Sequence, residues 1–234
     1  MKLSYLVTCK NEDRTLQNLL ERLETYAVEP YEVVILADVS DNPKTADILY
    51  HYSRELNFRV IQHPLDRNYG THKNFGGEQC KGKWIFQIDG DECPTIDLVI
   101  NVVDIIETNS AVDLIYVPRI NDFIGVTPQH AKMWGWHLSP CPVYNNRPIV
   151  NWHDPQSRIY RNDPSRIKWD RRLHEKIEGH KEFASLPADY NLALYHDKTI
   201  ETQLATNKRY NEWFTAEENR GHDVFTSKTS SSKP

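Results

Sequence analysis

Three carboxylates follow a short apolar segment in the first half of the chain. Asp89, Asp91 and Glu92 come directly after residues 84–88, whose sequence is WIFQI. Such a segment is typical of a buried strand, and open α/β sheets bind ligands beyond the carboxyl ends of their strands. Carboxylates placed there need a positive partner, and hard cations such as Mg²⁺ or Mn²⁺ prefer oxygen ligands. The pattern predicts a divalent cation with a phosphate-bearing substrate or, alternatively, a polar turn, because Asp-Gly is also a common hairpin signal.

Polar side chains also follow three other segments that we expect to be strands, at 3–8, 32–37 and 58–61. The carboxyl ends of parallel strands meet at one edge of a sheet, so these side chains would converge with the three acids. They are Thr8, Asn11 and Glu12 after the first strand, Asp38 and Ser40 after the second, and Asn68, Lys73 and Asn74 after the third. The topology suits nucleotide binding, but the chain has neither GxGxxG nor GxxxxGK[ST], which argues against the dinucleotide-binding and P-loop classes.

The first half of the chain alternates expected strands with expected helices. Helical spacing of apolar residues marks 15–23, 45–56, 73–80 and 98–108, and a further strand is expected at 114–118. This alternation predicts an α/β fold with a mostly parallel sheet. Beyond Arg119 we expect irregular structure and short antiparallel strands such as 157–161. A helix is expected at 199–218, and residues 221–234 are expected to be a disordered tail.

The composition is that of an ordinary globular protein. The 234 residues are 39% hydrophobic and 26% charged, which suits one large domain. The chain has no run of about eighteen apolar residues, so we expect no transmembrane segment, and its N-terminus reads as a strand rather than a signal peptide. The four cysteines are scattered without a CxxC pair, which disfavours a zinc site or a disulfide framework. We therefore expect a cytoplasmic protein, at most peripheral at a membrane surface.

Charge is unevenly distributed along the chain. Residues 119–181 carry a net charge of +5, from eleven Lys or Arg and six Asp or Glu, within an overall charge of −5. The same region holds aromatic residues, among them Trp134, Trp136, Trp152 and Trp169. Basic and aromatic side chains together suit sugars, phosphates or nucleic acid. The alternative interpretation is a loop-rich substructure whose aromatic side chains form its own core.

An ordered set of motifs in this chain resembles the glycosyltransferases of family 2, which have the GT-A fold. The motifs are TCKNE at 8–12, DVS at 38–40, NYG at 68–70 with KN at 73–74, and GKWIFQIDGDE at 82–92. Four further motifs follow in the second half of the chain, namely SRIYRN at 157–162, LHE at 173–175, LYH at 194–196 and KRY at 208–210. These later motifs are similar to those of the subgroup that contains lipopolysaccharide-core glucosyltransferases and peptide S-glycosyltransferases.

The resemblance implies a Rossmann-like, mostly parallel sheet flanked by helices, with an irregular acceptor-side region. Residues 1–118 would form the half that binds the nucleotide sugar, and residues 119–220 the acceptor-side and metal-completing half of the same domain. The implied activity is transfer of a hexosyl or pentosyl group from a nucleotide sugar to a hydroxyl group, with inversion at the anomeric carbon. A UDP-sugar is the expected donor, and Mn²⁺ or Mg²⁺ the expected cofactor.

The same resemblance implies roles for individual residues. Asp38 would accept hydrogen bonds from the nucleobase, Asp89 would contact the ribose or the metal, and Asp91 and His196 would ligate the metal. The other donor-binding candidates are Thr8, Asn11, Glu12, Ser40, Asn68, Lys73, Asn74 and Gly90. One departure concerns the turn after the second strand, where Ala37 and Val39 replace an acid and a glycine found in many relatives. This departure bears on nucleobase recognition and hence on the expected UDP preference.

An inverting displacement needs a base that takes the acceptor's proton. Glu175 is the expected base, because Arg171, Arg172 and Lys176 nearby favour its ionised form, and Asp154 is the reserve candidate. The alternative for Glu175 is an ion-pair partner on a basic surface. A glycan or lipid-linked saccharide is the favoured acceptor, and a hydroxymethylated base in DNA is the second.

Two other functional classes remain open at this point. A nucleotidyltransferase would share the sheet and the acids, but it usually has a glycine-rich loop with Arg and Lys after its first strand, where this chain has CKNE. A non-catalytic module that binds nucleotides or glycans would be expected to have lost its metal acids or its base. Asp89, Asp91, Glu175 and His196 are all present, which disfavours that reading.

Overall fold

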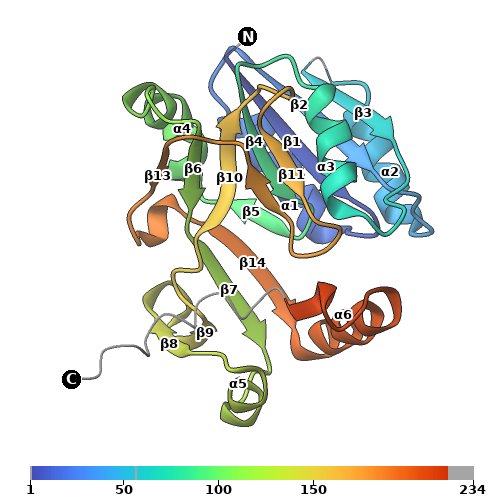
Figure 1. Cartoon of the computed structure of the whole chain (residues 1–234), viewed down its shortest axis with the longest axis vertical. Helices are drawn as coiled ribbons and strands as arrows, with labels where there is room; N and C mark the ends of the chain where they lie inside the picture. Colours follow the sequence, from blue (N-terminus) through green and yellow to red (C-terminus); the bar gives the residue numbers. More distant parts are fainter. Residues whose placement is uncertain (1, 56, 221–234) are drawn as a thin grey trace.

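The computed structural model describes residues 2–55 and 57–220. It contains a seven-stranded sheet in the order β13-β6-β10-β4-β1-β2-β3 and a five-stranded sheet in the order β5-β14-β7-β9-β8 (Figure 1). The first sheet comprises β1 (Leu3–Cys9), β2 (Tyr31–Ala37), β3 (Phe58–Gln62), β4 (Trp84–Asp89), β6 (Leu114–Val117), β10 (Gln156–Arg161) and β13 (Phe183–Ser185). The second comprises β5 (Glu92–Pro94), β7 (Arg119–Ile124), β8 (Leu138–Cys141), β9 (Arg147–Val150) and β14 (Leu194–Thr199). A separate hairpin pairs β11 (Lys168–Asp170) with β12 (Lys176–Glu178).

The helices are α1 (Arg14–Tyr26), α2 (Pro43–Tyr52), α3 (Tyr69–Glu78), α4 (Ile96–Thr108), α5 (Pro128–Trp134) and α6 (Ile200–Trp213). Short 3-10 turns occur at Pro142–Tyr144, Tyr190–Leu192 and Glu218–Arg220. In the first sheet β1 pairs in parallel with β2 and β4, and β2 in parallel with β3, while β10 runs antiparallel between β4 and β6. This arrangement confirms the predicted α/β fold with a mostly parallel sheet.

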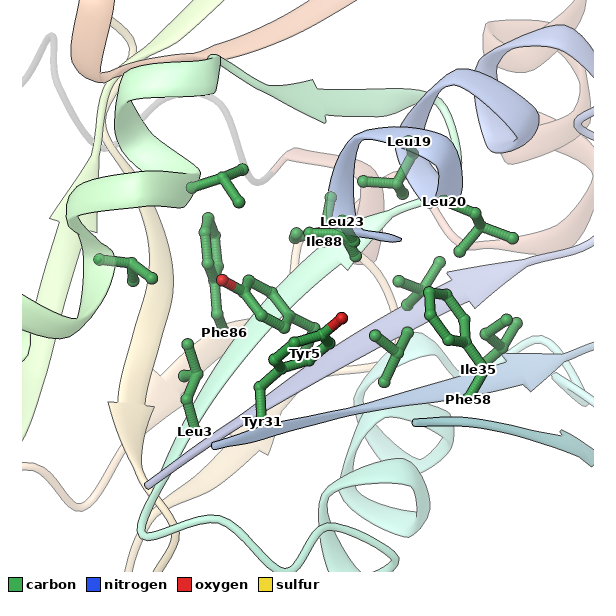
Figure 2. Close-up of a cluster of buried hydrophobic side chains, with 14 of the residues drawn as sticks. Leu3, Tyr5, Leu19, Leu20, Leu23, Tyr31, Ile35, Phe58, Phe86 and Ile88 are labelled. Carbon is green, nitrogen blue, oxygen red and sulfur yellow. The ribbon is translucent and has the colours of Figure 1, made fainter. Parts of the chain in front are cut away.

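Both faces of the large sheet are covered, as its near-continuous apolar strands require. On β1, Leu3, Tyr5 and Val7 point to one face, where they pack with buried residues of α1 and α4. Figure 2 shows this face, with Tyr5 between Tyr31 and Phe86 and with leucines of α1 above the strands. Leu6 points to the other face and shares a buried cluster with Trp169 of the β11–β12 hairpin. The two covered faces leave the carboxyl edge of the strands for ligands.

The predicted helices are present, with shifted ends. The third begins at Tyr69 rather than at residue 73, because the Asn68 side chain accepts a hydrogen bond of 3.0 Å from the amide of Thr71 and caps it. The second ends at Tyr52, and Leu56, where we expected its end, lies outside the described residues. The last ends at Trp213, five residues before the expected residue 218, because Phe214 is extended with φ −127°. The expected tail at 221–234 also lies outside the described residues.

The second half is more regular than its sequence suggests. The short strands expected there are present, but β14 pairs in parallel with β7, and α5 has no counterpart among the predicted elements. Tyr160 and Trp169 are each 4% exposed and belong to the core behind the large sheet. Trp152 stacks on Tyr190 at 4.2 Å within a smaller cluster. Trp152 therefore follows the alternative interpretation, in which the aromatic side chains form the core of their own region, whereas Tyr160 and Trp169 belong to the core of the large sheet.

Candidate active site

The acids after β4 lie at the carboxyl edge of the large sheet, beside the end of β1. The parallel register places Thr8 opposite Asp89, and the Thr8 hydroxyl donates a 2.9 Å hydrogen bond to Asp89 Oδ1. Gly90 follows with its amide 2.8 Å from the Thr8 carbonyl. A Cβ at Gly90 would lie 3.0 Å from Cys9 Cβ and 3.2 Å from the Thr8 carbonyl oxygen. Glycine at this position therefore lets the acidic turn pack against the end of β1.

Asp89 is held by two cations from other parts of the chain. Arg158 Nη2 donates to Asp89 Oδ2 at 2.7 Å, and Lys73 Nζ lies 3.0 Å from Asp89 Oδ1. Burial alone would raise the pKa of Asp89, but Arg158 and Lys73 outweigh this effect and hold the pKa well below its usual range. Asp89 is therefore an ionised acceptor whose position is fixed by Arg158 from β10 and Lys73 from α3.

Lys73 also links Asp89 to Glu175, the expected base. Its ammonium lies 2.6 Å from Glu175 Oε1 and 4.7 Å from the centre of the Trp169 ring. The side chain of Lys73 is 3% exposed and that of Glu175 is 15% exposed. Burial opposes the charged form of Lys73, but Asp89 and Glu175 together raise its pKa. Lys73 is therefore a buried cation between two carboxylates.

A segment that crosses the start of α3 positions Glu175. The carbonyl of Arg172 accepts a 3.0 Å hydrogen bond from the amide of Tyr69. Arg171 and His174 have φ of +72° and +52°, so the chain turns sharply on both sides of this contact. A Cβ at Gly70 would lie 2.4 Å from the Arg171 carbonyl oxygen. Only glycine allows this close approach, which explains a residue of the NYG motif in physical terms.

Asp91 faces two basic side chains of β14. His196 Nε2 lies 3.5 Å from Asp91 Oδ2, and Lys198 Nζ lies 3.0 Å from the same oxygen. Burial alone would raise the pKa of Asp91, but Lys198 and His196 lower it well below its usual range. Burial, with a further effect from Lys198, lowers the pKa of His196 despite the nearby Asp91. The imidazole is therefore neutral near pH 7 and can offer a lone pair.

Asn121 determines which imidazole nitrogen carries the proton. The Asn121 amide nitrogen donates to Asp154 Oδ2 at 2.7 Å, so its oxygen faces the imidazole, 2.7 Å from His196 Nδ1. An acceptor at this distance requires Nδ1–H, which leaves Nε2 unprotonated on the side of Asp91. The β14–β7 register, which pairs His196 with Asn121, builds this contact into the second sheet.

Asp154, the reserve base, lies within a dense set of donors. Its Oδ2 accepts from Arg119 Nε at 2.9 Å and from Arg119 Nη2 at 2.8 Å, as well as from Asn121, and its Oδ1 accepts from Gln156 at 3.0 Å. Burial alone would raise the pKa of Asp154, but Arg119 and Asn121 lower it. Glu92, whose side chain is 0% exposed, joins this set through Arg119 at 3.0 Å and Arg158 at 2.6 Å. Asp154 is therefore placed to orient its neighbours.

The candidates for the nucleoside end of the donor lie together after β1 and β2. Asp38 accepts from Lys10 Nζ at 2.8 Å and from the amide of Leu65 at 3.1 Å. Burial alone would raise the pKa of Asp38, but the hydrogen bond from Lys10 and those from main-chain amides lower it. The Ser40 hydroxyl donates to Asn11 Oδ1 at 2.8 Å. These contacts bring the residues after β1 and β2 to one end of the sheet edge.

Three other candidates have clear local roles. Glu12 Oε2 accepts from the amide of Lys10 at 2.6 Å, and burial raises the pKa of Glu12. Asn68 caps α3, as described above. The Asn74 side chain makes two 2.8 Å hydrogen bonds with the main chain of Trp169, one as donor and one as acceptor. Asn74 therefore links β11 to α3, and both polar atoms of its side-chain amide are used in these bonds.

The donor set around Asp91 fits a divalent cation in part. Within residues 2–55 and 57–220, no three His, Cys, Asp or Glu side chains lie close enough together to hold a metal ion. Of the predicted ligands, Asp91 and His196 converge, while Asp89 is engaged by Lys73 and Arg158. One carboxylate and one neutral imidazole fit an ion such as Mg²⁺ or Mn²⁺ whose remaining ligands are water and substrate phosphate oxygens.

Sequence reasoning missed three of these residues. Lys198 and Asn121 belong to no motif singled out above, and Arg158 appeared only within SRIYRN. One signal was available for Lys198, because residues i and i+2 of a strand share a face and Lys198 follows His196 at that spacing. No comparable signal identifies Asn121, whose role depends on the register between β7 and β14.

These features define an α/β sheet with acidic side chains at the carboxyl edge of its strands, and comparison with known proteins identifies its family. Residues 4–168 match the model of the family described as glycosyl transferase family 2, and the chain belongs to this family. The resemblance stated from the motifs is thereby confirmed. The family also disfavours the nucleotidyltransferase class.

Two curated relatives illustrate the range of matches. The chain is 27% identical over 116 residues to an uncharacterized glycosyltransferase of Haemophilus influenzae. The matched residues make up 50% of this chain and 38% of the relative. It is 33% identical over 92 residues to the lipopolysaccharide core biosynthesis glycosyltransferase LpsC of Rhizobium meliloti. That match makes up 39% of this chain and 32% of the relative. The matched region thus spans less than two fifths of each of these relatives.

Solved structures show the same fold. S. aureus TarS residues 1–349, in complex with UDP-GlcNAc, superimposes with a TM-score of 0.59 at 20% identity, covering 85% of this chain and 59% of TarS 1–349. A further crystal structure of S. aureus TarS gives a TM-score of 0.57 at 18% identity, and the match covers 97% of this chain and 44% of the TarS chain. Separately, none of the helices in the described part of the chain is long and apolar enough to cross a membrane.

Proposed function

We propose that this protein is an inverting glycosyltransferase that moves a sugar from a UDP-sugar to a hydroxyl group of a saccharide, with a divalent cation bound at Asp91 and His196. The observation that carries the proposal is the edge of the sheet itself. Asp38 and Asn11 lie at one end, Asp91 and His196 at the other, and Asp89 and Glu175 are joined through Lys73. Family membership supplies the reaction class, since the matched family is one of glycosyl transferases.

Glu175 is the proposed base. Its carboxylate is partly exposed, at 15%, and within residues 2–55 and 57–220 it forms an ion pair only with Lys73, at 2.6 Å from Oε1, which leaves the other oxygen for an acceptor hydroxyl. Asp154 accepts from Arg119, Asn121 and Gln156 and has less room for a substrate proton. This difference favours Glu175 over Asp154. Lys73 would hold the Glu175 carboxylate in place before the acceptor arrives.

Asp38 is proposed to bind the nucleobase. Its carboxylate accepts from Lys10 and from the amides of Val39 and Leu65, so of about four lone-pair positions one remains for a base N–H. The UDP-GlcNAc complex of TarS, a protein of the same fold, supports a uridine donor. Ala37 is buried on β2 and Val39 is 67% exposed, and beside them Asp38 is held by Lys10 and by the amides of Val39 and Leu65.

Asp91 and His196 are the residues that would hold the cation. When bound, the cation neutralises negative charge on the nucleoside diphosphate that leaves. Asp89, fixed by Arg158 and Lys73, is proposed to accept a hydrogen bond from the donor's ribose. Asn121 and Asp154 would act by orienting His196.

A saccharide acceptor is proposed from the relatives. The Rhizobium relative is named for lipopolysaccharide core biosynthesis. A second relative, from Staphylococcus epidermidis, is a poly-beta-1,6-N-acetyl-D-glucosamine synthase. It is 26% identical over 89 residues, which make up 38% of this chain and 21% of the relative.

We place the protein in the cytoplasm, because Cys9, Cys80, Cys93 and Cys141 are all free thiols.

A thermal-shift screen tests the proposal. Purified protein is heated with UDP-, GDP-, CMP- or dTDP-linked sugars, each with and without Mn²⁺. A rise in melting temperature that requires both Mn²⁺ and a UDP-sugar is expected, because a ligand that binds the native state stabilises it. Asp91→Asn should lose the Mn²⁺-dependent part of the rise. A wild-type protein that responds to no donor, and transfers no sugar from a UDP-sugar, would refute the proposal.

A further inference from the structure

Lys198 places an ammonium group where the proposed cation would bind. Its Nζ lies 3.0 Å from Asp91 Oδ2, the same oxygen that His196 Nε2 approaches at 3.5 Å. We propose that Lys198 occupies the cation site in the ligand-free protein, leaves Asp91 when a divalent cation binds, and then binds the diphosphate of the donor. This inference rests on the proposed function and assigns a further substrate-binding residue to the same site.

The first step is a competition between two cations for one carboxylate. An Mg²⁺ ion lies about 2.0–2.1 Å from a carboxylate oxygen, so it cannot share Asp91 Oδ2 with an ammonium group at hydrogen-bond distance without strong repulsion. The Lys198 ammonium lies 3.0 Å from Asp91 Oδ2, and the same carboxylate attracts either cation. Lys198 therefore compensates the Asp91 charge until the divalent cation arrives, and cation binding must displace it.

The second step concerns where the displaced ammonium goes. The Lys198 side chain is 17% exposed, so most of it is enclosed by the protein around Asp91. Among residues 2–55 and 57–220, Asp91 is the only carboxylate that forms an ion pair with Lys198. Oxygens of a diphosphate bound to the same cation would be the nearest remaining anions. Lysine suits this exchange, because its compact charge sits on a flexible four-carbon stem.

The exchange would matter most as the sugar leaves the diphosphate. Negative charge grows on the departing phosphate oxygen, and a second cation directed at it stabilises that charge further. His196 cannot supply this second charge, because its Nδ1–H is directed at Asn121 and its Nε2 would be occupied by the divalent cation. Lys198 is thus the side chain beside Asp91 that can bind the diphosphate oxygens once the divalent cation is in place.

The test compares Lys198→Met with Lys198→Arg, and uses Lys132→Met on the exposed face of α5 as the control. Mn²⁺ affinity is measured by calorimetry without any donor, and UDP affinity is measured separately at saturating Mn²⁺. We expect Lys198→Met to bind Mn²⁺ about 10-fold more tightly, because its competitor is gone, and to bind UDP about 10-fold more weakly. Turnover should fall by about 10²-fold, the size found when a charge-stabilising group is removed.

Lys198→Arg keeps the charge, so its Mn²⁺ affinity should stay near wild type, and it should retain part of the UDP affinity. Lys132→Met should leave every constant unchanged. Opposite changes in the two affinities are specific to the exchange, since a merely structural role would weaken both. The inference is overturned if wild type binds Mn²⁺ and UDP while Lys198→Met leaves both affinities unchanged or weakens both. The proposed function fails separately, if wild type binds neither Mn²⁺ nor a UDP-sugar and transfers no sugar.

Discussion

His196 Nδ1 lies 2.7 Å from Asn121 Oδ1, and this contact directs the other imidazole nitrogen toward Asp91. Because Asn121 also donates to Asp154 at 2.7 Å, its amide cannot rotate without losing a hydrogen bond to a carboxylate. The tautomer of the histidine is thus determined by two side chains that lie behind it. Under the proposed function, Asn121 would act on cation binding through His196, without being a ligand itself.

Replacing Asn121 should weaken cation binding without removing a ligand. Asn121→Leu leaves His196 free to carry its proton on Nε2, so we expect Mn²⁺ affinity to fall about 10- to 100-fold. Calorimetry gives the affinity, and ¹⁵N NMR of the imidazole in the cation-free protein reports the tautomer directly. Asn101→Leu, on the exposed face of α4, is the control and should change neither reading. An Asn121→Leu protein with an unchanged tautomer would contradict the assignment.

Glu175 and Asp154 should respond differently to loss of charge. Glu175→Gln removes the proposed base, so turnover should fall about 10²- to 10⁴-fold while Mn²⁺ and UDP affinities stay near wild type. Asp154→Asn removes a partner of Arg119 and Asn121, so its first effect should be on Mn²⁺ affinity. Steady-state kinetics and calorimetry on both variants separate these roles. The assignment of the base would be reversed if Asp154→Asn alone abolished turnover with cation binding intact.

Removing Arg158 should destabilise the fold. Arg158 bridges Asp89 at 2.7 Å and Glu92 at 2.6 Å, and the Glu92 side chain is 0% exposed. Arg158→Met leaves a buried carboxylate without this partner, which typically costs about 3–5 kcal/mol. Urea denaturation followed by circular dichroism measures the loss in the free energy of unfolding. Arg14→Met, at an exposed position of α1, should change it by less than about 0.5 kcal/mol.

Two glycines of α3 offer a matched pair of substitutions. An alanine Cβ at Gly70 would lie 2.4 Å from the Arg171 carbonyl oxygen, whereas at Gly77 it would meet nothing closer than Tyr160 at 3.6 Å. Gly70→Ala should therefore displace the segment that carries Glu175 and lower turnover at least 10-fold, with a loss of about 1–3 kcal/mol in stability. Gly77→Ala should keep activity and gain up to about 1 kcal/mol from helix propensity. Equal activity of the two variants would show that the segment tolerates displacement.

Stability should fall in mild acid because of His72. This side chain is 4% exposed, and burial, with a further effect from His63, lowers its pKa to about 4. The unfolded chain takes up a proton near its ordinary pKa of about 6.5, so the stabilisation is complete above that pH and is lost as pH falls toward 4. The loss approaches about 3 kcal/mol. Denaturation at pH 7 and pH 5 measures it, with His72→Gln reducing the pH dependence and the exposed His137→Gln leaving it unchanged.

The fold was largely predictable from the sequence, and the site only in part. Apolar segments followed by acids predicted β1, β2 and β4. The residues that follow parallel strands lie together at the carboxyl edge of the sheet, so the acids could also be placed there. The two-residue spacing from Asp89 to Asp91 also indicated that the acids form one group. The structure divides them, since Asp89 pairs with Lys73 and Arg158 and Asp91 pairs with Lys198.

What the sequence could not supply is long-range pairing. Lys73 and Glu175 are 102 residues apart, and Asn121 and His196 are 75 apart. Neither separation leaves a periodic signal, because both contacts depend on how strands from the second half pair with each other and with the first. The start of α3 was misplaced for a local reason, namely that the two glycines at 76 and 77 obscured a helix whose cap lies at Asn68.

The position of β10 has a consequence for how the chain is made. This strand lies between β4 and β6, and its Arg158 is 69 residues beyond Asp89 in the sequence. At a synthesis rate of about 5–20 residues per second, the edge of β4 is made several seconds before β10 and Arg158, which pair with it in the folded protein. A nascent chain at that stage exposes an unpaired strand edge, a surface that chaperones protect. We therefore expect residues 1–118 expressed alone to aggregate.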